Sequence, residues 1–420
     1  MIAEEKIYLV GGAVRDTLDG RTVNDWDYVV VGVTPEAMIE AGFEQVGADF
    51  PVFLHPETKE EYALARTERK SGTGYHGFEV DASPSVTLEE DLARRDLTVN
   101  AMAVDYQSRT VDPYGGQQDL EDRILRHTSD AFLEDPLRVL RVARFMARMS
   151  DSGWQVHPDT MDMMTEIARS GELSKITPER IWKETSRALL EPTPSAFIKT
   201  LRECEALQHV FPEVDALFGV PQPPKHHPEV DSGVHTMMVM EQAARLSDRL
   251  EVRFGAMVHD LGKAVTDPEN WPKHHGHEEL GIPVIEALCD RLKVPNAIRT
   301  AGVQASEFHL NVHRAFEIKA TTAVKMFDRL GIKNKRHQLD DLLLVSEADA
   351  RGRTGFEHRD YPQADYLATL ADKMLQVDAK AVASEHKGDG QAIREAIYRE
   401  SVKAVKVEMS HLKADGPEMK

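Results

Sequence analysis

The sequence predicts an α+β N-terminal region with a mixed β-sheet and helices, followed by regions that are all α-helical. Strand-like segments alternate with short helical segments from Lys6 to about Tyr106, with Gly, Pro and Asp between them. From about Pro136 onwards the strand signals fade, and apolar residues recur at the spacing of an amphipathic helix. The proline-rich run over 221–224 then interrupts the helical pattern and indicates a linker. These changes predict four segments, over 1–135, 136–224, 228–333 and 334–420.

Composition limits the class of protein. The chain has 420 residues, with 51 Lys and Arg against 71 Asp and Glu, and a net charge of −20. A charge of this sign repels nucleic acid, so an RNA-binding role requires basic residues that are concentrated locally. Cys204 and Cys289 are the two cysteines, which excludes a disulfide framework and a cysteine-rich zinc site. The sequence shows no apolar signal region and no apolar run of membrane length, so we expect a soluble cytoplasmic protein.

The first predicted strand, over 6–10, ends at a turn formed by Gly11 and Gly12. Glycine leaves backbone N–H groups bare, and a helix that begins at such a turn directs its N-terminus at a bound phosphate. Arg15 follows within that helix. A lone Gly-Gly turn is common, however, and a dinucleotide-binding fingerprint fits poorly because its third glycine is replaced by Arg15 and Asp16.

A pair of aspartates lies at the start of the second predicted strand, over 26–32, with Asp25 before it and Asp27 near its first residue. Alternation along an extended backbone places Asp25 and Asp27 on the same side. Neighbouring carboxylates repel unless a cation lies between them, and hard oxygen ligands suit Mg²⁺. Such a pair is also common as a solvated strand start, but beside a phosphate turn it indicates phosphoryl or nucleotidyl transfer. Glu61, in the predicted strand over 60–65, is a candidate third carboxylate.

Arginines provide the positive charge that a triphosphate requires. Arg94 and Arg95 precede a fourth predicted strand, over 97–104, although they could also form surface ion pairs. The segment 134–148 predicts a helix with Asp135 as its N-cap and Pro136 at its first position. One face of this helix consists of arginines, which suit phosphates and base edges better than a merely solvated face does. These residues are Arg141, Arg144 and Arg148.

The second half of the chain holds a series of histidines and aspartates on predicted helices. A single His-Asp pair means little, because most histidines are surface or core residues. Imidazole and carboxylate ligands that converge from several helices form divalent-metal sites, so we predict such a site here. The series consists of His235, His259, Asp260, His274, His275, His277 and His309.

Five linked motifs resemble those of the bacterial-type CCA-adding tRNA nucleotidyltransferases. In the family's order they are GGAVRD from Gly11, the pair Asp25 and Asp27, RRDLTVN from Arg94, DPYGG from Asp112, and EDPLR from Glu134. The resemblance extends beyond Arg353 and is to the longer form of the family, which has a C-terminal HD phosphohydrolase domain. It implies an α+β nucleotidyltransferase head, an all-α neck and body, an all-α HD domain and a helical C-terminal segment.

The resemblance implies template-independent addition and repair of the 3′-terminal CCA of tRNA from CTP and ATP, with release of diphosphate. Asp25 and Asp27 would be the catalytic carboxylates that hold Mg²⁺. Asp135 and Arg138 would read the Watson–Crick edge, because C and A share an exocyclic amine that a carboxylate can accept from. The other nucleotide-binding residues would be Gly12, Arg15, Arg95, Arg141 and Arg144.

For the HD domain, the resemblance implies metal-dependent hydrolysis of 2′,3′-cyclic phosphates, 2′-nucleotides and phosphate monoesters. His259 and Asp260 would be the catalytic pair, and the metal would be a divalent transition metal, with Ni²⁺ as the candidate. The expected metal ligands are His235, His259, Asp260, His277 and His309. The closing aspartate is Asp328, Asp349 or another, and the choice between monomer and homodimer stays open.

Three other functions are compatible with parts of the sequence. A poly(A) polymerase shares the same head, but the appended HD domain argues against it. An HD hydrolase with a decayed head is disfavoured because the head motifs are all intact. A non-catalytic RNA-binding scaffold is disfavoured by the acidic net charge and by the intact pair Asp25 and Asp27.

Overall fold

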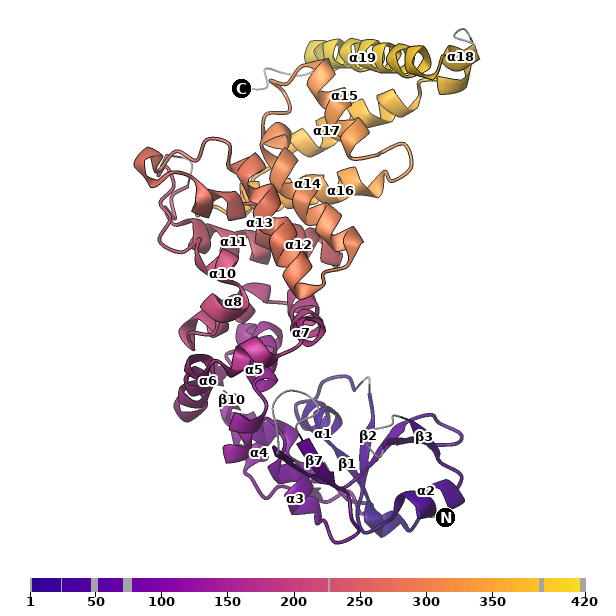
Figure 1. Cartoon of the computed structure of the whole chain (residues 1–420), viewed down its shortest axis with the longest axis vertical. Helices are drawn as coiled ribbons and strands as arrows, with labels where there is room; N and C mark the ends of the chain where they lie inside the picture. The colour runs from indigo at the N-terminus through magenta and orange to yellow at the C-terminus, as the bar shows by residue number, and fades with distance from the viewer. Residues whose placement is uncertain are drawn as a thin grey trace. The chain divides into compact units, whose positions relative to one another are not determined.

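The computed structural model describes residues 2–23, 25–46, 52–70, 78–225, 227–384 and 389–415. The chain forms two compact units, which are identified in Figure 1 by their element labels. The N-terminal unit comprises Met1–Thr185 and Ala196–Val210, and the C-terminal unit comprises Ser186–Ser195 and Phe211–Lys420. Among the residues described, no helix is both long and apolar enough to cross a bilayer.

The N-terminal unit contains a mixed sheet with the strand order β3-β4-β5-β2-β1-β8-β9, which confirms the predicted fold class. Its strands are β1 (Ile7–Val10), β2 (Asp27–Val30), β3 (Glu44–Val46), β4 (Val52–Leu54), β5 (Glu61–Leu64), β8 (Ala103–Val104) and β9 (Thr110–Val111). Two further pairs are β6 (Thr67–Lys70) with β7 (Phe78–Asp81), and β10 (Ile124–Leu125) with β11 (Gln155–Val156).

Strand register brings the predicted carboxylates to one end of the central strands. β1 is antiparallel to β2, and β2 is parallel to β5. Asp27 therefore lies opposite Val10 on one side and opposite Glu61 on the other. The chain leaves β1 at Gly11 and enters α1, so the glycine turn lies next to Asp27.

The helices of the N-terminal unit follow the predicted change from strands to helices. They are α1 (Gly12–Leu18), α2 (Pro35–Glu40), α3 (Leu88–Ala93), α4 (Gly116–Asp122), α5 (Leu137–Met149), α6 (Pro158–Ser170) and α9 (Leu207–Val210). α7 (Pro178–Leu190) and α8 (Pro194–Glu203) contain residues of both units. Short 3₁₀ helices are η1 (Glu4–Lys6), η2 (Thr98–Asn100), η3 (Asp130–Glu134), η4 (Ser150–Ser152) and η5 (Glu172–Lys175).

The strand predicted over 97–104 is wrong for most of its length. Thr98 begins the 3₁₀ turn η2, and only the two residues of β8 join the sheet. The Thr98 hydroxyl donates to Asp119 at 2.6 Å, and a Cβ on Gly116 would lie 2.3 Å from the Thr98 carbonyl oxygen. This close approach of α4 favours a tight turn over an extended strand, and the turn carries Asn100 towards α1.

The C-terminal unit is helical within the residues that the structure describes. Its elements are α10 (Pro212–Asp215), α11 (Ser232–Leu246), α12 (Leu250–Val258), η6 (Leu261–Val265), η7 (Pro268–Asn270), α13 (His277–Leu292), α14 (Asn296–His313), α15 (Ala320–Arg329), α16 (His337–Arg351), α17 (Pro362–Leu375), α18 (Ala379–Ser384) and α19 (Gly390–Asp415). One core joins α11, α12, α14 and α16 through small residues such as Ala256 and Ala305. A second core, which includes Phe327, Leu367 and Val405, joins α15, α17 and α19.

Candidate active sites

A cavity of about 530 Å³ lies beside the glycine turn of the N-terminal unit. All the nucleotide-binding residues predicted from the sequence line it, together with Asp27. They are Gly12, Arg15, Arg95, Asp135, Arg138, Arg141 and Arg144. Asp25 does not line this cavity and lies on exposed, irregular backbone two residues before Asp27.

The glycine turn has a backbone conformation that L-residues avoid. Gly11 has φ +71° and ψ −135°, and α1 begins at the next residue, Gly12. A Cβ on Gly11 would lie 3.0 Å from Nη1 of Arg95. The absence of a side chain therefore lets the backbone approach a guanidinium group that faces the same cavity.

Asp27 lines the cavity, and Asp25, two residues earlier and outside the lining, acts on it electrostatically. Withdrawal from water raises the pKa of Asp27, Arg95 lowers it in part, and the charge of Asp25 raises it again. Asp27 and Asp25 present only oxygen donors, which is the donor chemistry that a small hard cation such as Mg²⁺ prefers. The two aspartates therefore fit a divalent metal, with Arg95 available to balance charge on the other side.

The three arginines of the predicted α5 face line the cavity, and each is paired with a carboxylate. Arg144 is buried and donates to Glu184 at 2.6 Å. Arg141 lies 2.7 Å from Asp96. Burial alone would raise the pKa of Asp96, but Arg141 and hydrogen bonds hold this pKa well below its usual range. Arg144 alone takes its partner from α7, whereas Arg148 is paired with Asp16 of α1 at 3.1 Å.

Asn100 and Asp16 fix the arginine that follows the glycine turn. Arg15 is buried, lies 2.8 Å from Asp16, and donates to the side-chain oxygen of Asn100. Asn100 also donates to Asp96 at 3.1 Å, so one amide connects two parts of the network. Sequence reasoning missed Asn100, although it closes the RRDLTVN motif.

Asp135 is held by two donors at the start of α5. Its Oδ1 accepts from the backbone N–H of Leu137 at 3.0 Å, and its Oδ2 accepts from Arg180 at 3.0 Å. The helix begins at Leu137 with Pro136 as its N-cap, one residue later than predicted, and Asp135 lies just before the cap while its side chain accepts from the first helical N–H. Arg138 in the first turn donates to the carbonyl oxygen of Arg94. Arg180 was missed, because nothing in its local sequence links it to Asp135.

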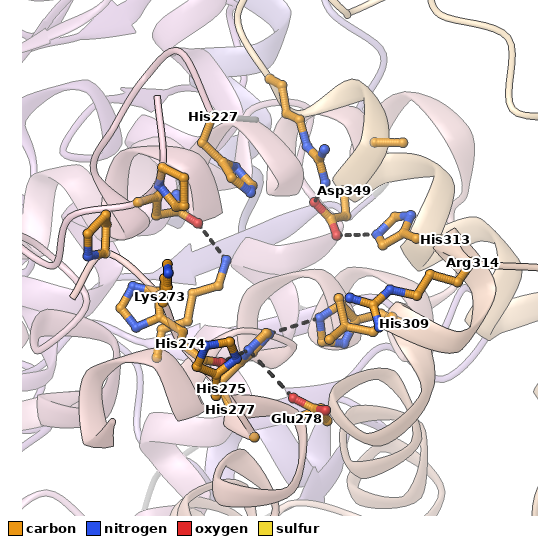
Figure 2. Close-up of a pocket in the computed structure, with 18 of the residues that line it drawn as sticks. His227, Lys273, His274, His275, His277, Glu278, His309, His313, Arg314 and Asp349 are labelled. Atoms are coloured by element: carbon orange, nitrogen blue, oxygen red, sulfur yellow. Dashed lines mark hydrogen bonds and ion pairs between the residues drawn. The ribbon is translucent and has the colours of Figure 1, made fainter. Parts of the chain in front are cut away.

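A second cavity, of about 650 Å³, lies in the C-terminal unit, and Figure 2 shows the side chains around it. His277, His309 and Asp349 line this cavity. His235, His259 and Asp260 are fully or almost fully buried. The residues form two potential metal-ligand groups, within each of which the ligand atoms lie within 4.8 Å of one another. The groups are His235, His259 and Asp349, and Asp260, His277 and His309.

Asp349 is the aspartate that closes the series. Its Oδ1 lies 3.0 Å from Nε2 of His235, and it extends from α16 into the cavity wall. Asp328 lies in α15, forms an ion pair with Lys333 at 3.4 Å, and belongs to neither ligand group. The sequence alone left both aspartates open as alternatives.

Backbone carbonyl groups set the tautomers of these histidines. The Nδ1 atoms of His259, His277 and His309 donate to backbone carbonyl oxygens at 2.9 Å, 2.7 Å and 3.0 Å. Each Nε2 atom therefore carries a lone pair, as a metal ligand requires. Burial also lowers the pKa of His309 to about 3, which keeps this ring neutral.

Two buried polar atoms in this cluster lack a hydrogen-bond partner among the described residues. They are Nε2 of His259 and Oδ1 of Asp260. Buried polar atoms are normally satisfied, so the pair indicates that a cation belongs between them. Burial alone would raise the pKa of Asp260, but Lys263 at 2.6 Å and the neighbouring histidines hold this pKa well below its usual range. The donor set therefore fits a divalent transition metal.

Gly262, in the stretch VHDLGK, permits close packing beside the cluster. A Cβ on Gly262 would lie 1.9 Å from the carbonyl oxygen of His277 and 2.7 Å from the backbone nitrogen of Gly281. Only glycine allows η6 to contact α13 at this distance. This contact brings Asp260, just before η6, against His277 at the start of α13, at 3.3 Å.

His313 and Tyr361 extend the cluster and were missed from the sequence. His313 Nε2 lies 2.6 Å from Oδ2 of Asp349, and the Tyr361 hydroxyl lies 2.7 Å from His313 Nδ1. Arg353 also donates to Asp349 at 3.2 Å. His313 and Arg353 thus orient the carboxylate that faces His235, and Tyr361 contacts the far nitrogen of His313.

Three family models match successive stretches of this chain. Residues 7–126 match the poly A polymerase head domain, and residues 153–218 match the probable RNA- and SrmB-binding site of polymerase A. Residues 233–353 match the HD domain, so His235 and Asp349 lie inside this match. Both types of catalytic domain imply dependence on a divalent metal.

The multifunctional CCA protein of Methylococcus capsulatus is 54% identical over 403 residues, which are 96% of this chain and 94% of the relative. The protein of that name from Shewanella frigidimarina is 56% identical over 377 residues, or 90% of this chain and 91% of the relative. The chain belongs to the multifunctional CCA protein family. Family membership confirms the resemblance that the five motifs predict.

Solved CCA-adding enzymes share the fold of this multifunctional CCA family member. An apo form II structure has a TM-score of 0.64 at 18% identity, covering 97% of this chain and 91% of the other. The Bacillus stearothermophilus enzyme in complex with CTP has a TM-score of 0.62 at 21% identity, covering 97% and 93%. These likenesses confirm the order of an α+β head followed by helical regions.

Proposed function

We propose that the N-terminal unit adds and repairs the 3′-terminal CCA of tRNA from CTP and ATP, releasing diphosphate without a nucleic-acid template. The observation that carries this proposal is the single cavity in which the glycine turn, Asp27 and the paired arginines meet. Relatives that are named for CCA support the choice of product. The solved complexes of CCA-adding enzymes with CTP, with ATP and with tRNA support the substrates.

In this proposal Asp25 and Asp27 hold Mg²⁺, which when bound lowers the pKa of the terminal ribose hydroxyl and neutralises the leaving diphosphate. Arg15, Arg95 and Arg141 surround the triphosphate with positive charge. The glycine turn lets the phosphates approach the backbone closely. Because carboxylates and Asn100 fix the guanidinium groups before the nucleotide binds, little side-chain entropy is lost on binding.

Base selection is assigned to Asp135 and Arg138 at the start of α5. Both oxygens of Asp135 already accept hydrogen bonds, from Leu137 and Arg180, which fixes the carboxylate relative to the helix. A fixed acceptor discriminates better than a mobile one, because a base that offers the wrong pattern leaves a polar group unpaired. A single site of this kind accepts both C and A, which share the exocyclic amine.

For the C-terminal unit we propose a phosphohydrolase that acts on 2′,3′-cyclic phosphates, 2′-nucleotides and phosphate monoesters. His235, His259, Asp260 and Asp349, together with His277 and His309, would hold the metal, for which Ni²⁺ is the candidate. The metal when bound supplies an activated water molecule. Lys263 keeps Asp260 ionised, and the cavity admits the phosphoester past Lys273 and Arg314, which line it.

The decisive experiment uses tRNA that ends at the discriminator base, with Mg²⁺, CTP and ATP together and separately. The wild-type chain should add C, C and A and then stop, and an Asp25→Ala/Asp27→Ala variant should add nothing. His259→Ala should retain addition but lose hydrolysis of 2′,3′-cyclic AMP. Long runs of A without CTP would instead show a poly(A) polymerase, and no turnover at either site would show a non-catalytic RNA-binding protein.

A further inference from the structure

Glu229 is a buried carboxylate whose one oxygen contacts two histidines of the C-terminal unit. Its side chain is only 2% exposed. Oε1 lies 2.9 Å from Nδ1 of His235 and 3.0 Å from Nδ1 of His227. Oε2 is buried and has no hydrogen-bond partner in the described part of the chain. Burying a carboxylate costs free energy unless hydrogen bonds or ion pairs compensate both of its oxygens. Because Oε2 has no such partner, the position of Glu229 requires an explanation.

The residue that follows Glu229 has a strained backbone conformation. Val230 has φ +63°, a conformation that a β-branched residue rarely adopts. The turn is held on both sides, because Gln222 donates to the Val230 carbonyl and Asp231 accepts from the first turn of α11 at 2.9 Å. The fold therefore accepts an unfavourable backbone angle at the residue that follows Glu229.

His235 has different neighbours on its two nitrogens. Its Nδ1 is flanked by Glu229 Oε1 and by the Gly352 carbonyl oxygen at 3.0 Å, whereas its Nε2 faces Asp349. Two acceptors beside Nδ1 place the ring proton there and leave the Nε2 lone pair directed at the candidate metal position. A carboxylate behind a metal-binding imidazole also increases the basicity of that ring.

We propose that Glu229 is a positioning residue of the candidate metal centre, which holds His235 in the metal-binding tautomer and ties His227 to the cavity wall. This inference rests on the proposed metal-dependent hydrolase. His227 lines the cavity, and its ring points into it (Figure 2). The His227 and His235 rings lie edge to face with their centroids 4.6 Å apart. Oε1 of Glu229 therefore contacts both His227, which lines the cavity, and His235, a proposed metal ligand.

His227, Glu229 and His235 are also close enough to hold a metal of their own. That reading requires Nδ1 of His235 to lose its proton while it faces the Gly352 carbonyl oxygen, which would then repel the lone pair. The hydrogen-bonded arrangement avoids this repulsion. The two arrangements predict different metal stoichiometries, so one titration distinguishes them.

The test is a Co²⁺ titration of the metal-stripped full-length chain. Calorimetry measures the affinity and the number of bound ions, and visible absorption reports the surroundings of the bound Co²⁺. Glu229→Ala should weaken the affinity roughly 10- to 100-fold, the usual effect of losing an outer partner of a ligand. Glu229→Gln keeps an acceptor oxygen and should lose less. His227→Gln should leave the number of bound ions unchanged while the KM for 2′,3′-cyclic AMP rises.

Glu278 provides a matched control. It lines the same cavity and lies 3.6 Å from Nδ1 of His277, but that nitrogen already donates to the His274 carbonyl oxygen at 2.7 Å. Glu278→Gln should therefore bind Co²⁺ with wild-type affinity and with the same absorption spectrum. CCA addition by each variant, which depends on the other unit, checks that the chain is intact.

Three results would overturn the inference. Wild-type affinity in both Glu229→Ala and Glu229→Gln would show that the carboxylate does not position His235. An equal loss in Glu278→Gln would show a general effect of charge in the cavity. Loss of one of two bound ions in His227→Gln would show that Glu229 belongs to a separate metal site. Failure of the wild-type chain to bind any divalent metal would instead refute the proposed hydrolase itself.

Discussion

Arg144 in α5 donates a hydrogen bond to Glu184 in α7 across 2.6 Å, and both side chains are almost completely buried. The guanidinium group also lies over the ring of Phe145, 4.8 Å from its centroid. Arg144 therefore forms part of the wall of the nucleotide cavity, where its charge is compensated before any ligand binds. The pair joins two helices whose sequences contain no sign of this contact.

Glu184→Ala should destabilise the chain by about 3–5 kcal/mol, because it leaves a buried guanidinium group without its carboxylate partner. The KM for CTP should rise as Arg144 moves. Thermal unfolding and steady-state kinetics measure these effects. The double variant Arg144→Met/Glu184→Leu should recover much of the stability but not the KM. If Glu184→Ala unfolds like the wild type, the pair does not stabilise the helix contact.

Gly11→Ala should cost roughly 1–3 kcal/mol of stability, because it forces an L-residue into a strained backbone conformation. It should also raise the KM for both nucleotides, since the new Cβ would lie 3.0 Å from Arg95. Gly20→Ala is the control, because Gly20 also has positive φ, +69°, but no atom lies within 4 Å of its added Cβ. An unchanged KM in Gly11→Ala would contradict a phosphate-binding role for this turn.

Asp135→Asn should relax base selection without abolishing transfer. The amide keeps an oxygen that can accept from Leu137, but it presents a donor where the carboxylate accepts from the base. Discrimination of CTP and ATP against UTP and GTP should fall roughly 10- to 100-fold in kcat/KM, equivalent to one or two lost hydrogen bonds. Competition assays measure it, and Glu134→Gln, at the same cavity, should discriminate normally. Unchanged discrimination would show that residues other than Asp135 select the base.

Asp341, near the start of α16, should make stability depend on pH. Burial raises its pKa to about 7, and Arg249 at 2.9 Å offsets this only in part. The folded chain therefore binds this proton more tightly than the unfolded chain, whose aspartates titrate near ~3.9. The stability that Asp341 contributes is present below that value and is lost as pH rises towards 7.

Asp341→Asn should therefore raise the melting temperature more at pH 8 than at pH 5. Differential scanning at both pH values measures the difference. Asp340→Asn, one residue earlier and exposed, is the control and should show no such dependence. A change in melting temperature that is the same at both pH values would mean that Asp341 has the same charge at pH 5 and pH 8, and would contradict the raised pKa.

The sequence predicted those parts of the sites that depend on local chemistry. Gly11 and Gly12 follow a strand, Asp27 begins one, and Asp135 accepts from the first backbone N–H of a helix that begins one residue later than expected. Five members of the histidine and aspartate series also lie in the two metal-ligand groups. His235, His277 and His309 lie on helices, and His259 and Asp260 directly follow α12. Local patterns thus located the candidate groups, while the roles of individual residues stay predictions.

What the sequence did not reveal depends on contacts between distant segments. Glu184 lies 40 residues from Arg144, and Asp349 lies 114 residues from His235, so no local pattern connects them. The strand predicted over 97–104 failed for a similar reason, since Gly116 packs against Thr98 and favours a turn. Burial of Arg144 likewise depends on α7, which local periodicity cannot place.

The main-chain anchoring of the histidines limits how mutation can alter the C-terminal site. His259, His277 and His309 donate to carbonyl oxygens of the backbone, which no single substitution removes. Such ligand orientation is robust to mutation. Of the four rings in the two ligand groups, His235 has a side-chain carboxylate within 3.0 Å of its Nδ1 among the described residues. His235 also faces the Gly352 carbonyl oxygen, so Glu229 adds to its main-chain anchor an orienting contact that a single side-chain substitution removes.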